Sequence, residues 1–534
     1  MSLDIRPDHL QIIQTILHKH VPNLAVWAFG SRAKWTAKEY SDLDLCIISK
    51  KPTNFKVLGA MTEAFSESNL PYTVDIVDWA TVSESFRKII ERDKVPLQKP
   101  SRVFTESVVW PTLPLEECLD ALIDYRGKTP KKTDSGIPLI TAKIIKAGRI
   151  EKAFEFIAVD GYDAWMRRGI PQAGDVVLTT EAPLGEVAQL GKEKVALAQR
   201  VVTLRGKSGL LDSTFLLYLL QTEEMQEQLK ARATGTTVLG IKQSELRKLS
   251  VMIPPMNLQI NSASTLAAID SRINLLRETN TTLEAIAQAL FKSWFVDFDP
   301  VHAKQQGREP EGMDTSTAAL FPDSFEESEL GLVPMGWNTC AIYDLATYIN
   351  GAAYKAFEPN LERRGLPIIK IAELKSGVST QTAHSDVSMP EKYRILTKDI
   401  LFSWSGNPDT SIDTFVWSFD EAWLNQHIFR VLPNEAIERS FVLQTLKHLR
   451  PVFAELARNK QTTGLGHVTV ADLKRLQIIK PKKSILEYFD SVASPIHDEI
   501  FNNVQMIQSL SNLRDTLLPR LISGQLRLPD NTPA

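Results

Sequence analysis

The chain has 534 residues, of which 43% are hydrophobic and 23% are charged, and its formal net charge at pH 7 is −3. This length is too great for one hydrophobic core and predicts several domains. The small net charge does not decide for or against a nucleic-acid partner, because a basic patch can be offset elsewhere in the chain.

Neither the start of the chain nor its cysteines indicate a membrane or an oxidising compartment. The N-terminus, MSLDIRPDHL, lacks a basic and apolar leader, and no apolar run reaches the roughly 18 residues of a membrane span. Cys46, Cys118 and Cys340 fit no metal or disulfide spacing. We therefore expect a cytoplasmic protein without a membrane partner.

Residues 1–98 are predicted to form a small α/β domain with acidic residues on neighbouring strands. Asp42 and Asp44 alternate along a short apolar strand, which places both carboxylates on one face. Asp75 lies on the next predicted strand, at 72–79. Two carboxylates on one face can share a divalent cation such as Mg²⁺, because hard cations take oxygen ligands. The pattern therefore predicts a metal site at Asp42, Asp44 and Asp75.

Gly30 and Ser31 end a buried strand and would offer backbone N–H groups to a nucleotide phosphate at a strand-to-helix junction. Together with Asp42, Asp44 and Asp75 they resemble the polymerase-beta-type nucleotidyltransferase superfamily in its minimal form. The resemblance implies transfer of a nucleoside monophosphate, with Mg²⁺ and a nucleoside triphosphate as cofactors. It also implies that Asp42 and Asp44 bind the metal, while Asp75 binds metal or activates the acceptor hydroxyl.

Trp35 departs from that family pattern, in which the Gly-Ser-Arg-Ala run often continues to a glycine. The departure affects how closely the loop approaches a phosphate, and it removes no ligand. Two alternatives to an active enzyme stay open, since a fold does not by itself establish an activity. The acidic residues could simply face solvent, or the domain could be a catalytically inactive member of the same fold.

From about residue 110 to the C-terminus the sequence repeats at an offset near 227, which predicts two domains of one mixed α/β architecture. Short motifs recur at or close to this offset, namely Gly136-Ile137-Pro138 with Gly365-Leu366-Pro367, and Gln199 with Gln426.

A long helix is predicted over 258–295, because apolar residues recur there with a heptad spacing and no Gly or Pro interrupts them. The same seam recurs at the offset of 227 over 495–522, with Ser494-Pro495 as the expected N-cap and first helical residue. Each helix carries one seam asparagine, Asn280 or Asn503, and a polar seam residue can fix the register of a coiled coil. We predict that the two helices form an antiparallel coiled coil.

Each repeated domain contains a cluster of basic residues and a loop rich in Ser, Thr and Gly. The segment 126–152 contains eight Lys and Arg residues and two acidic residues. The segment 447–483 contains nine Lys and Arg residues and two acidic residues. Such clusters suit contacts to DNA phosphates, and a solvated face is the alternative for any one of them. The candidate DNA-binding residues are Arg126, Lys128, Lys131, Lys132, Lys143, Lys146, Thr236 and Lys242 in the first copy, and Lys370, Lys460, Thr462 and Lys474 in the second.

This order of elements resembles the specificity subunit of type I DNA restriction–modification enzymes. The most similar segments are ALFKSWFVDFDPVHAK (289–304), FPDSFEESELGLVPMGW (321–337) and LRDTLLPRLISGQL (513–526). The resemblance implies two target-recognition domains that each bind half of a bipartite site on double-stranded DNA. It also implies a coiled coil that sets the half-site spacing and docks two methyltransferase subunits, which restriction (translocase) subunits then join.

The expected fold class is an α/β (α+β) multidomain chain. The predicted parts are a nucleotidyltransferase-like domain (1–98), a first recognition domain (110–256), a central helix (257–298), a connector (299–336), a second recognition domain (337–482), a C-terminal helix (483–526) and a tail (527–534).

No methyltransferase or ATPase motif occurs in the sequence. The specificity portion is therefore expected to bind and assemble without a cofactor of its own. The alternative function is a Mg²⁺-dependent nucleotidyltransferase that modifies a protein or nucleic acid and is targeted by the DNA-binding domains. A structural DNA adaptor without modification partners is a third hypothesis.

Overall fold

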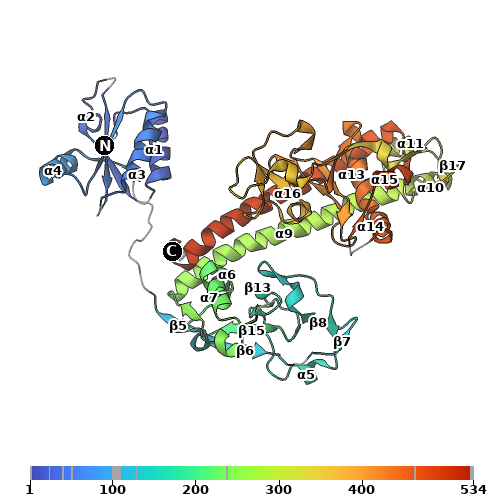
Figure 1. Ribbon diagram of the computed structural model, residues 1–534, viewed down its shortest axis with the longest axis horizontal. Helices are drawn as coiled ribbons and strands as arrows, with labels where there is room; N and C mark the ends of the chain where they lie inside the picture. The colour runs from blue at the N-terminus through green and yellow to red at the C-terminus, as the bar shows by residue number, and fades with distance from the viewer. Residues whose placement is uncertain are drawn as a thin grey trace. The chain divides into compact units, whose positions relative to one another are not determined.

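The computed structural model describes residues 3–22, 24–38, 41–49, 52–98, 110–127, 129–235, 238–461 and 465–528 (Figure 1). The chain divides into two compact units. One consists of Met1–Leu266 with Thr516–Ala534, and the other of Ala267–Asp515. Within the described ranges, no helix has both the length and the apolar character needed to cross a bilayer.

The N-terminal domain contains a sheet of order β3-β2-β1-β4, in which β2 and β3 run parallel and the other pairs run antiparallel. Its elements are α1 (Pro7–His20), β1 (Ala25–Phe29), α2 (Gly30–Ala33), β2 (Leu43–Ile48), α3 (Phe55–Ser66), β3 (Val74–Asp78), α4 (Glu84–Asp93) and β4 (Val95–Gln98). Ile13 and Leu17 of α1 pack in one core with Leu43 and Leu45 of β2, and all four are fully buried. The apolar face of β2 thus leaves the alternating aspartates on the other side of the strand.

The first repeat domain (residues 110–256) has a main sheet of order β13-β12-β15-β6 and a second sheet of order β14-β8-β11-β7. Its elements are β5 (Thr112–Pro114), η1 (Leu115–Cys118), β6 (Leu119–Asp124), β7 (Lys132–Thr133), β8 (Ile137–Ile140), η2 (Ala142–Ile144), β9 (Ile145–Lys146), β10 (Arg149–Ile150), β11 (Phe156–Ile157), α5 (Tyr162–Trp165), β12 (Val176–Thr180), β13 (Leu184–Gln189), β14 (Ala196–Leu197), β15 (Val201–Gly206), α6 (Ser213–Gln221), α7 (Glu223–Ala231), α8 (Gln243–Leu246) and β16 (Ser250–Met252). Strand β16 pairs with β5 and leads directly into the long helix α9.

The second repeat domain (residues 337–482) has an equivalent main sheet, and its second sheet shares three strands with that of the first domain but has its fourth strand at the opposite edge. Its main sheet has the order β26-β24-β28-β20, and its second sheet the order β22-β21-β27-β23. Its elements are β19 (Asn338–Ala341), η3 (Ile342–Leu345), β20 (Ala346–Asn350), η4 (Tyr354–Phe357), β21 (Leu366–Ile369), α12 (Ile371–Ser376), β22 (His384–Ser385), η5 (Glu391–Tyr393), β23 (Arg394–Ile395), β24 (Ile400–Ser403), β25 (Ser405–Gly406), β26 (Asp413–Val416), β27 (Ala422–Leu424), β28 (Ile428–Pro433), η6 (Ala436–Glu438), α13 (Arg439–His448), α14 (Arg450–Asn459), β29 (Gly466–His467), α15 (Val470–Arg475) and β30 (Gln477–Lys480). Strand β28 lies at an offset of 227 from β15, residue for residue, and the predicted duplication is confirmed.

The two glycines of the repeated Gly-x-Pro motif have the same structural role. Gly136 precedes β8 and Gly365 precedes β21, and both have positive φ, +133° and +75°. A Cβ on Gly136 would overlap the backbone carbonyl of Ile157, and one on Gly365 would overlap that of Ser385. The motif recurs because the chain must approach a neighbouring strand closely at this point in each copy.

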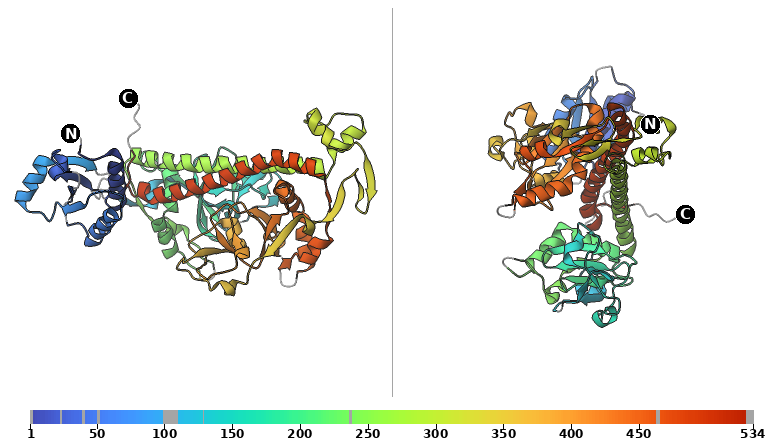
Figure 2. Two further views of the ribbon diagram at one scale, coloured as in Figure 1. Left: turned by 90° about the horizontal axis from the view of Figure 1, so that it is seen from above. Right: turned by 90° about the vertical axis from the view of Figure 1, so that its right-hand side faces the viewer.

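The two long helices are α9 (Met256–Phe295) and α16 (Lys483–Ile522), each of 40 residues, and their bounds differ by 227 at both ends. They lie side by side and run antiparallel (Figures 1 and 2). The pairs that show this direction are Ser262 with Leu521, Asp270 with Arg514, Asn280 with Asn503, and Phe291 with Phe489. The predicted antiparallel coiled coil is therefore confirmed.

The predicted start of the second helix was wrong. Pro495 does not begin α16 but lies inside it, twelve residues after Lys483. A proline inside a helix costs about 3 kcal/mol, because it removes a backbone donor and clashes with the preceding turn. That cost is offset by packing of the first turns, since Ile485, Leu486 and Phe489 are buried in the core of the second repeat domain.

A connector of mixed structure joins α9 to the second repeat domain. It contains α10 (Asp299–Gln305), α11 (Thr315–Leu320) and a hairpin of β17 (Phe325–Ser328) and β18 (Gly331–Pro334). Trp337, which follows the hairpin, packs against Phe295 and Phe298. The connector thus shares the core of the second repeat domain.

In the other unit, the end of α16 lies against the start of the first repeat domain. Gly524 follows the helix with φ of +70°, and a Cβ at this position would overlap the indole ring of Trp110. Trp110 is the residue that corresponds to Trp337 at the offset of 227. A tryptophan therefore marks the entry to each repeat domain.

Candidate functional sites

In the N-terminal domain, Gly30 lies directly against the carboxylate of Asp44. Gly30 is the first residue of α2 after β1, and its φ is +78°. A Cβ at this position would overlap Oδ2 of Asp44. The glycine is therefore required both for the backbone turn and for the approach of the turn to the acidic strand.

Asp44 and Asp75 are register partners on the parallel strands β2 and β3, so that their side chains leave the same face of the sheet. Asp42 precedes β2 and accepts a hydrogen bond from the hydroxyl of Thr73. Burial raises the pKa of Asp44, and the negative charges of Asp75 and Asp42 raise it further. Three acidic groups therefore lie near one another, in the electrostatic setting that a bound cation relieves.

The described residues contain no group of three or more His, Cys, Asp and Glu side chains arranged to hold a metal ion. Asp75 is exposed, whereas Asp44 is half-buried. Ser31 lies at the second position of the four-residue helix α2. The roles predicted for Ser31 and for the three aspartates stay predictions.

The first repeat domain has a polar hollow of about 360 Å³ where several strands end. Its lining includes Arg126, which follows β6, and Lys242, which precedes α8. A neighbouring hollow of about 270 Å³ is lined by Lys132 and Lys143, among others. The structure thus brings four of the predicted DNA-binding residues to two adjoining hollows.

Three of the predicted lysines in this domain have acidic neighbours. Lys132 and Lys143 lie 2.8 and 3.9 Å from Glu155, and Lys146 lies 2.9 Å from Glu151. These pairs are exposed on the lysine side, and such pairs contribute at most about 1 kcal/mol each. The ammonium groups are therefore still available to a phosphate, at a lower net local charge than the sequence count indicates.

Arg126 is held more firmly. Its guanidinium donates to the carbonyl of Ile241 at 2.7 Å and lies 3.2 Å from the carboxylate of Asp124. Arg126 thus connects the end of β6 to the loop before α8.

The remaining predicted residues of this domain differ in what the structure describes. Lys131 and Lys242 are exposed. Lys128, Thr236 and Thr462 lie outside the described residues.

In the second repeat domain, Lys460 holds a buried carboxylate. Its ammonium group lies 2.5 Å from Asp472, whose side chain is fully buried and also accepts from the backbone N–H of Thr469. Burial opposes ionisation of Asp472, but the hydrogen bonds from Lys460 and Thr469 outweigh it and hold the pKa of Asp472 well below its ordinary value. The charge of Lys460 is thus engaged within the domain.

Two other predicted lysines lie beside aromatic rings. The ammonium group of Lys370 is 5.2 Å from the ring centroid of Tyr354, and that of Lys474 is 4.9 Å from the centroid of Tyr343. Lys474 is exposed, whereas Lys370 is half-buried. Their DNA-binding roles stay predictions.

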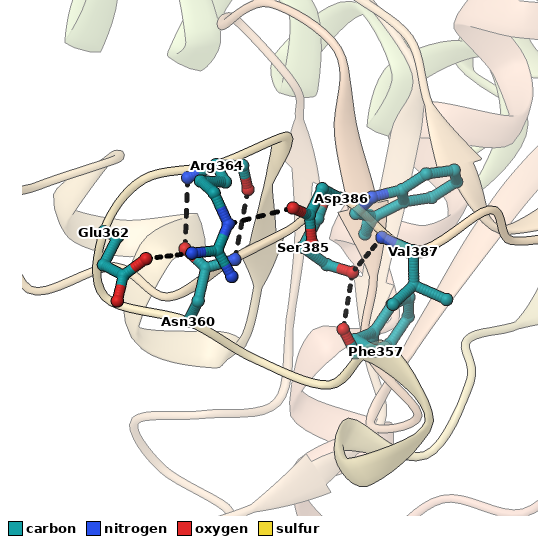
Figure 3. A network of polar contacts seen from close by, with 8 residues as sticks. Phe357, Asn360, Glu362, Arg364, Ser385, Asp386 and Val387 are labelled. Atoms are coloured by element: carbon teal, nitrogen blue, oxygen red, sulfur yellow. Dashed lines mark hydrogen bonds and ion pairs between the residues drawn. The ribbon is translucent and has the colours of Figure 1, made fainter.

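A polar network outside the predicted residues orders the loops around β21 in the same domain (Figure 3). Arg364 forms ion pairs with Glu362 and Asp386, and its backbone N–H donates to the side chain of Asn360 at 3.1 Å. The hydroxyl of Ser385 donates to the carbonyl of Phe357. The side chain and backbone of Arg364 thus stabilise the loops on either side of β21.

Sequence reasoning missed the residues that lie between strands at the hollows. Arg200 lines both hollows of the first repeat domain and lies 2.7 Å from Glu181. His427 holds the corresponding place in the second domain, where its ring lies 5.7 Å from that of Trp404. The available signal was the repeated Gln199 and Gln426, since Arg200 and His427 are the next residues in the two copies.

The two seam asparagines of the coiled coil meet. The side-chain amide of Asn503 donates to Oδ1 of Asn280 at 2.9 Å, and the amide of Asn280 donates to the carbonyl of Ile500 at 3.2 Å. Asn503 is buried. Both side-chain amides thus donate within the coiled coil, which is consistent with a register-fixing pair. The predicted role in register stays a prediction.

The family model described as the type I restriction modification DNA specificity domain matches residues 115–285 and 334–506, which together form more than half of the chain. The chain belongs to this family. Both matched segments combine one repeat domain with part of one long helix, so the family unit and the observed repeat agree. The resemblance proposed from the sequence is confirmed.

Two curated specificity subunits are similar over most of their length. The type I restriction enzyme MjaIX specificity subunit of Methanocaldococcus jannaschii is 27% identical over 361 residues, which cover 67% of this chain and 78% of that protein. The HindI specificity subunit of Haemophilus influenzae is 26% identical and covers 62% of this chain and 82% of that protein. The crystal structure of an S subunit from M. genitalium covers 82% of this chain and all of that one, at 16% identity and a TM-score of 0.49.

The N-terminal domain has relatives of its own. The polymerase beta nucleotidyltransferase family matches residues 11–102. The probable protein adenylyltransferase MntA of Haemophilus influenzae is 53% identical over 101 residues, which cover 19% of this chain and 89% of that protein. The domain therefore belongs to the nucleotidyltransferase family, and the chain joins it to a specificity subunit.

Proposed function

We propose that residues 110–528 act as the DNA-specificity subunit of a type I restriction–modification complex, with each repeat domain binding one half of a bipartite site on duplex DNA. The observation that carries this proposal is the recurrence of one domain frame at an offset of 227 in a chain of the specificity family. One frame present twice can hold two different sets of base-contacting side chains. The two half-sites can therefore differ in sequence.

Affinity in this proposal comes from basic side chains at the hollows and specificity from polar side chains between them. Lysines such as Lys131 and Lys242 are exposed, and they contact phosphates in any sequence. Amide and guanidinium groups can donate to base edges in the major groove. Phosphate contacts then position each domain, and base contacts select the sequence.

The coiled coil is proposed as the docking surface for methyltransferase subunits, which restriction subunits then join. Large apolar side chains are exposed along both helices, namely Leu275, Ile286, Met506 and Leu513. Exposed apolar residues along a paired helix fit a protein partner better than they fit solvent. Because α9 and α16 are equivalent at an offset of 227, they offer related surfaces to two copies of one partner.

The test is selection from a pool of duplexes with two randomised half-sites, using the full chain purified with the methyltransferase from its own genome. At near-physiological salt we expect enrichment of one bipartite sequence with a fixed spacing. Methylation mapping on the same DNA should place modified adenines within both halves. Binding without any sequence preference would contradict the proposal.

A second function is proposed for the N-terminal domain, because Gly30 lies against Asp44 beside two further acidic groups. We propose that it transfers a nucleoside monophosphate from a nucleoside triphosphate to a hydroxyl group of a protein. The acceptor oxygen forms a bond to the α-phosphorus, pyrophosphate leaves, and the hydroxyl proton passes to a base, for which Asp75 is the candidate. A protein acceptor is chosen because MntA is named a probable protein adenylyltransferase.

The residues present fit Mg²⁺ as a pair of ligands rather than a closed cluster. Asp42 and Asp44 would hold the ion, since Mg²⁺ is bound through one or two carboxylates plus substrate phosphates. The ion would neutralise charge on the triphosphate. Labelled nucleoside triphosphates with Mg²⁺ should label a protein partner with the wild-type chain but not with Asp42→Ala/Asp44→Ala, whose DNA selection should be unchanged. Equal labelling by both would exclude this site.

A further inference from the structure

One dipeptide occupies the same place in both repeat domains. Gln199 and Arg200 lie between β14 and β15, and Gln426 and His427 lie between β27 and β28. The glutamine is therefore common to the two copies, and the residue after it is not. A position with a shared backbone and a different side chain is what two related domains need in order to recognise different bases.

The backbone of the dipeptide is held by the same hydrogen bond in each copy. The N–H of Thr180, at the end of β12, donates to the carbonyl of Arg200 at 2.9 Å. The N–H of Trp404, directly after β24, donates to the carbonyl of His427 at 3.3 Å. Arg200 and His427 thus stand on an equivalent and fixed support, as a precise contact requires.

A second strand contact, also repeated, lies next to this hydrogen bond. In the first copy Glu181 forms a β-bridge with Gly240. In the second copy β25 pairs with β29, and Ser405 is the register partner of His467. His467 corresponds to Gly240 at the offset of 227. Gly240 and His467 are therefore anchored to the same strand end as the dipeptide in their domains.

In the first domain the dipeptide lies where the two hollows meet, because Gln199 and Arg200 line both. The side chain of Gln199 accepts a hydrogen bond from the hydroxyl of Thr129 at 3.1 Å. Arg200 is exposed and pairs with Glu181, which is also nearly half exposed. An exposed pair of this kind is weak, so Arg200 can exchange Glu181 for another acceptor at little cost.

We propose that Gln199–Arg200 and Gln426–His427 are the base-contacting dipeptides of the two domains, and that Arg200 and His427 make the two half-sites differ. Arg200 contacts a guanine through its paired N–H groups, because that fork matches the O6 and N7 acceptors of guanine in the major groove. A glutamine amide can pair with adenine in a similar two-bond geometry. This proposal rests on the DNA-recognition function proposed above.

The guanidinium geometry separates a base contact from a phosphate contact. A phosphate accepts lysine or arginine, whereas the two-bond contact to guanine needs the planar fork. Lys242 lines the larger hollow together with Arg200 and offers a point charge suited to a phosphate. The two residues should therefore respond differently when base preference and overall affinity are measured separately.

The test uses the full chain with its methyltransferase and the pool of duplexes with two randomised half-sites. Arg200→Lys should lower the preference at one base pair of one half-site about five- to a hundredfold, which is the usual value of one bidentate contact. Binding to unselected duplex should change less than about twofold, because the charge is kept. The other half-site should be unchanged.

Two further variants make the outcome decisive. His427→Arg should alter one base pair of the other half-site and leave the first half-site unchanged. Lys207→Ala is the matched control, since Lys207 follows β15 at the end away from Arg200, roughly 20 Å along the strand, and it should leave both half-sites unchanged.

The possible failures are distinct. If the wild-type chain selects no sequence, the proposed function itself is wrong. If the wild type selects a bipartite site and Arg200→Lys and His427→Arg leave it unaltered, the base-contacting dipeptides are wrong while the specificity function stands. If Arg200→Ala weakens binding to all sequences equally and Arg200→Lys restores that binding, Arg200 is a phosphate contact and the proposal is overturned.

Discussion

The two repeat domains share a frame but are attached to the long helices by different chemistry. Where α16 enters the second domain, Leu486 and Phe489 are buried among aromatic side chains. At the corresponding positions of α9 the first domain has Gln259 and Ser262. The same helical position therefore carries an apolar joint in one copy and a polar joint in the other.

The polar joint is fully hydrogen-bonded. Gln259 is buried, and its amide oxygen accepts from the N–H of Asp212 at 2.9 Å. Its amide nitrogen donates to the carbonyls of Leu210 and Pro254 at 2.9 and 2.8 Å. The two copies therefore have the same backbone geometry at this joint, but one is packed with apolar side chains and the other is hydrogen-bonded. Four predictions follow the difference, from the largest effect to the smallest.

Phe489→Ala should destabilise its unit by about 3–5 kcal/mol, because it empties a fully buried aromatic position. The ring contacts Phe291, Trp294 and Phe295. Ser262→Ala, at the matching position of α9, should cost less than about 1 kcal/mol, since it removes one hydrogen bond. Hydrogen exchange resolved by mass spectrometry measures each unit separately. Equal losses at the two joints would contradict the proposed difference.

Lowering the pH should loosen the second joint. Burial, followed by the positive charges of Lys447 and Arg439, lowers the pKa of His497 to about 4. The negative charges of Glu284 and Asp490 act in the opposite direction and are outweighed. A histidine with a depressed pKa stabilises the fold above its ordinary pKa of about 6.5, and this stability is lost as the pH falls toward 4. The loss should be about 3 kcal/mol in full.

The measurement is the unfolding midpoint of the full chain in urea, followed by tryptophan fluorescence between pH 7 and pH 4. His497→Gln can keep hydrogen bonds to Ser440 and Gln444, which the ring contacts at 3.3 and 3.0 Å, and it does not titrate. Its midpoint should therefore fall less over this range than that of the wild type. Asp270 is the matching residue of α9 and pairs with Arg514 at 2.9 Å. A wild-type profile parallel to that of His497→Gln would exclude His497 as the cause.

Asn280→Leu should destabilise the coiled coil by about 1–3 kcal/mol, because it leaves the buried amide of Asn503 without its partner. The double substitution Asn280→Leu/Asn503→Ile should recover most of this loss, since both polar groups are then removed. Denaturant unfolding of the two single variants and the double variant gives the coupling between the residues. Additive losses would show that the asparagines do not act as a pair.

The smallest effect should appear in the salt dependence of DNA binding. Lys242→Ala should lower the slope of log affinity against log salt by about 0.9, because one phosphate contact is lost. Lys460→Ala should leave the slope nearly unchanged and instead weaken the fold around Asp472, which Lys460 holds. Binding to a non-specific duplex at several salt concentrations measures both. The reverse ranking would show that the ion pair opens on DNA.

Much of the fold could be predicted because it depends on patterns that recur along the chain. The repeat was visible in Gln199 and Gln426 at an offset of 227, and in Gly136 and Gly365 close to it. Those glycines are needed where the backbone comes close to a neighbouring strand. The heptad seam likewise predicted the pairing of the long helices. The start of α16 was predicted wrongly, because proline is common at the first position of a helix and Pro495 was placed there. The helix instead begins earlier, since Phe489 is buried in a core whose other residues are remote in sequence.

The candidate sites were less accessible from the sequence. Asp42, Asp44 and Asp75 could be placed near one another because strand alternation and chain order fix their neighbourhood. The state of a lysine, by contrast, depends on partners from other segments, and nothing near Lys460 indicated that it holds Asp472. Arg200 was missed for the same reason, since its place at the two hollows depends on strands that meet only in the fold.

The contact between Trp110 and Gly524 brings the first described residue of the specificity portion against the residues that follow α16, within one compact unit. These two ends are therefore close enough for a short linker to join them. A chain that starts after the connector hairpin, at Trp337, and joins 526 to 110 by a short linker should fold with the same two domains. The N-terminal domain, residues 1–98, precedes Trp110 and therefore interrupts neither repeat.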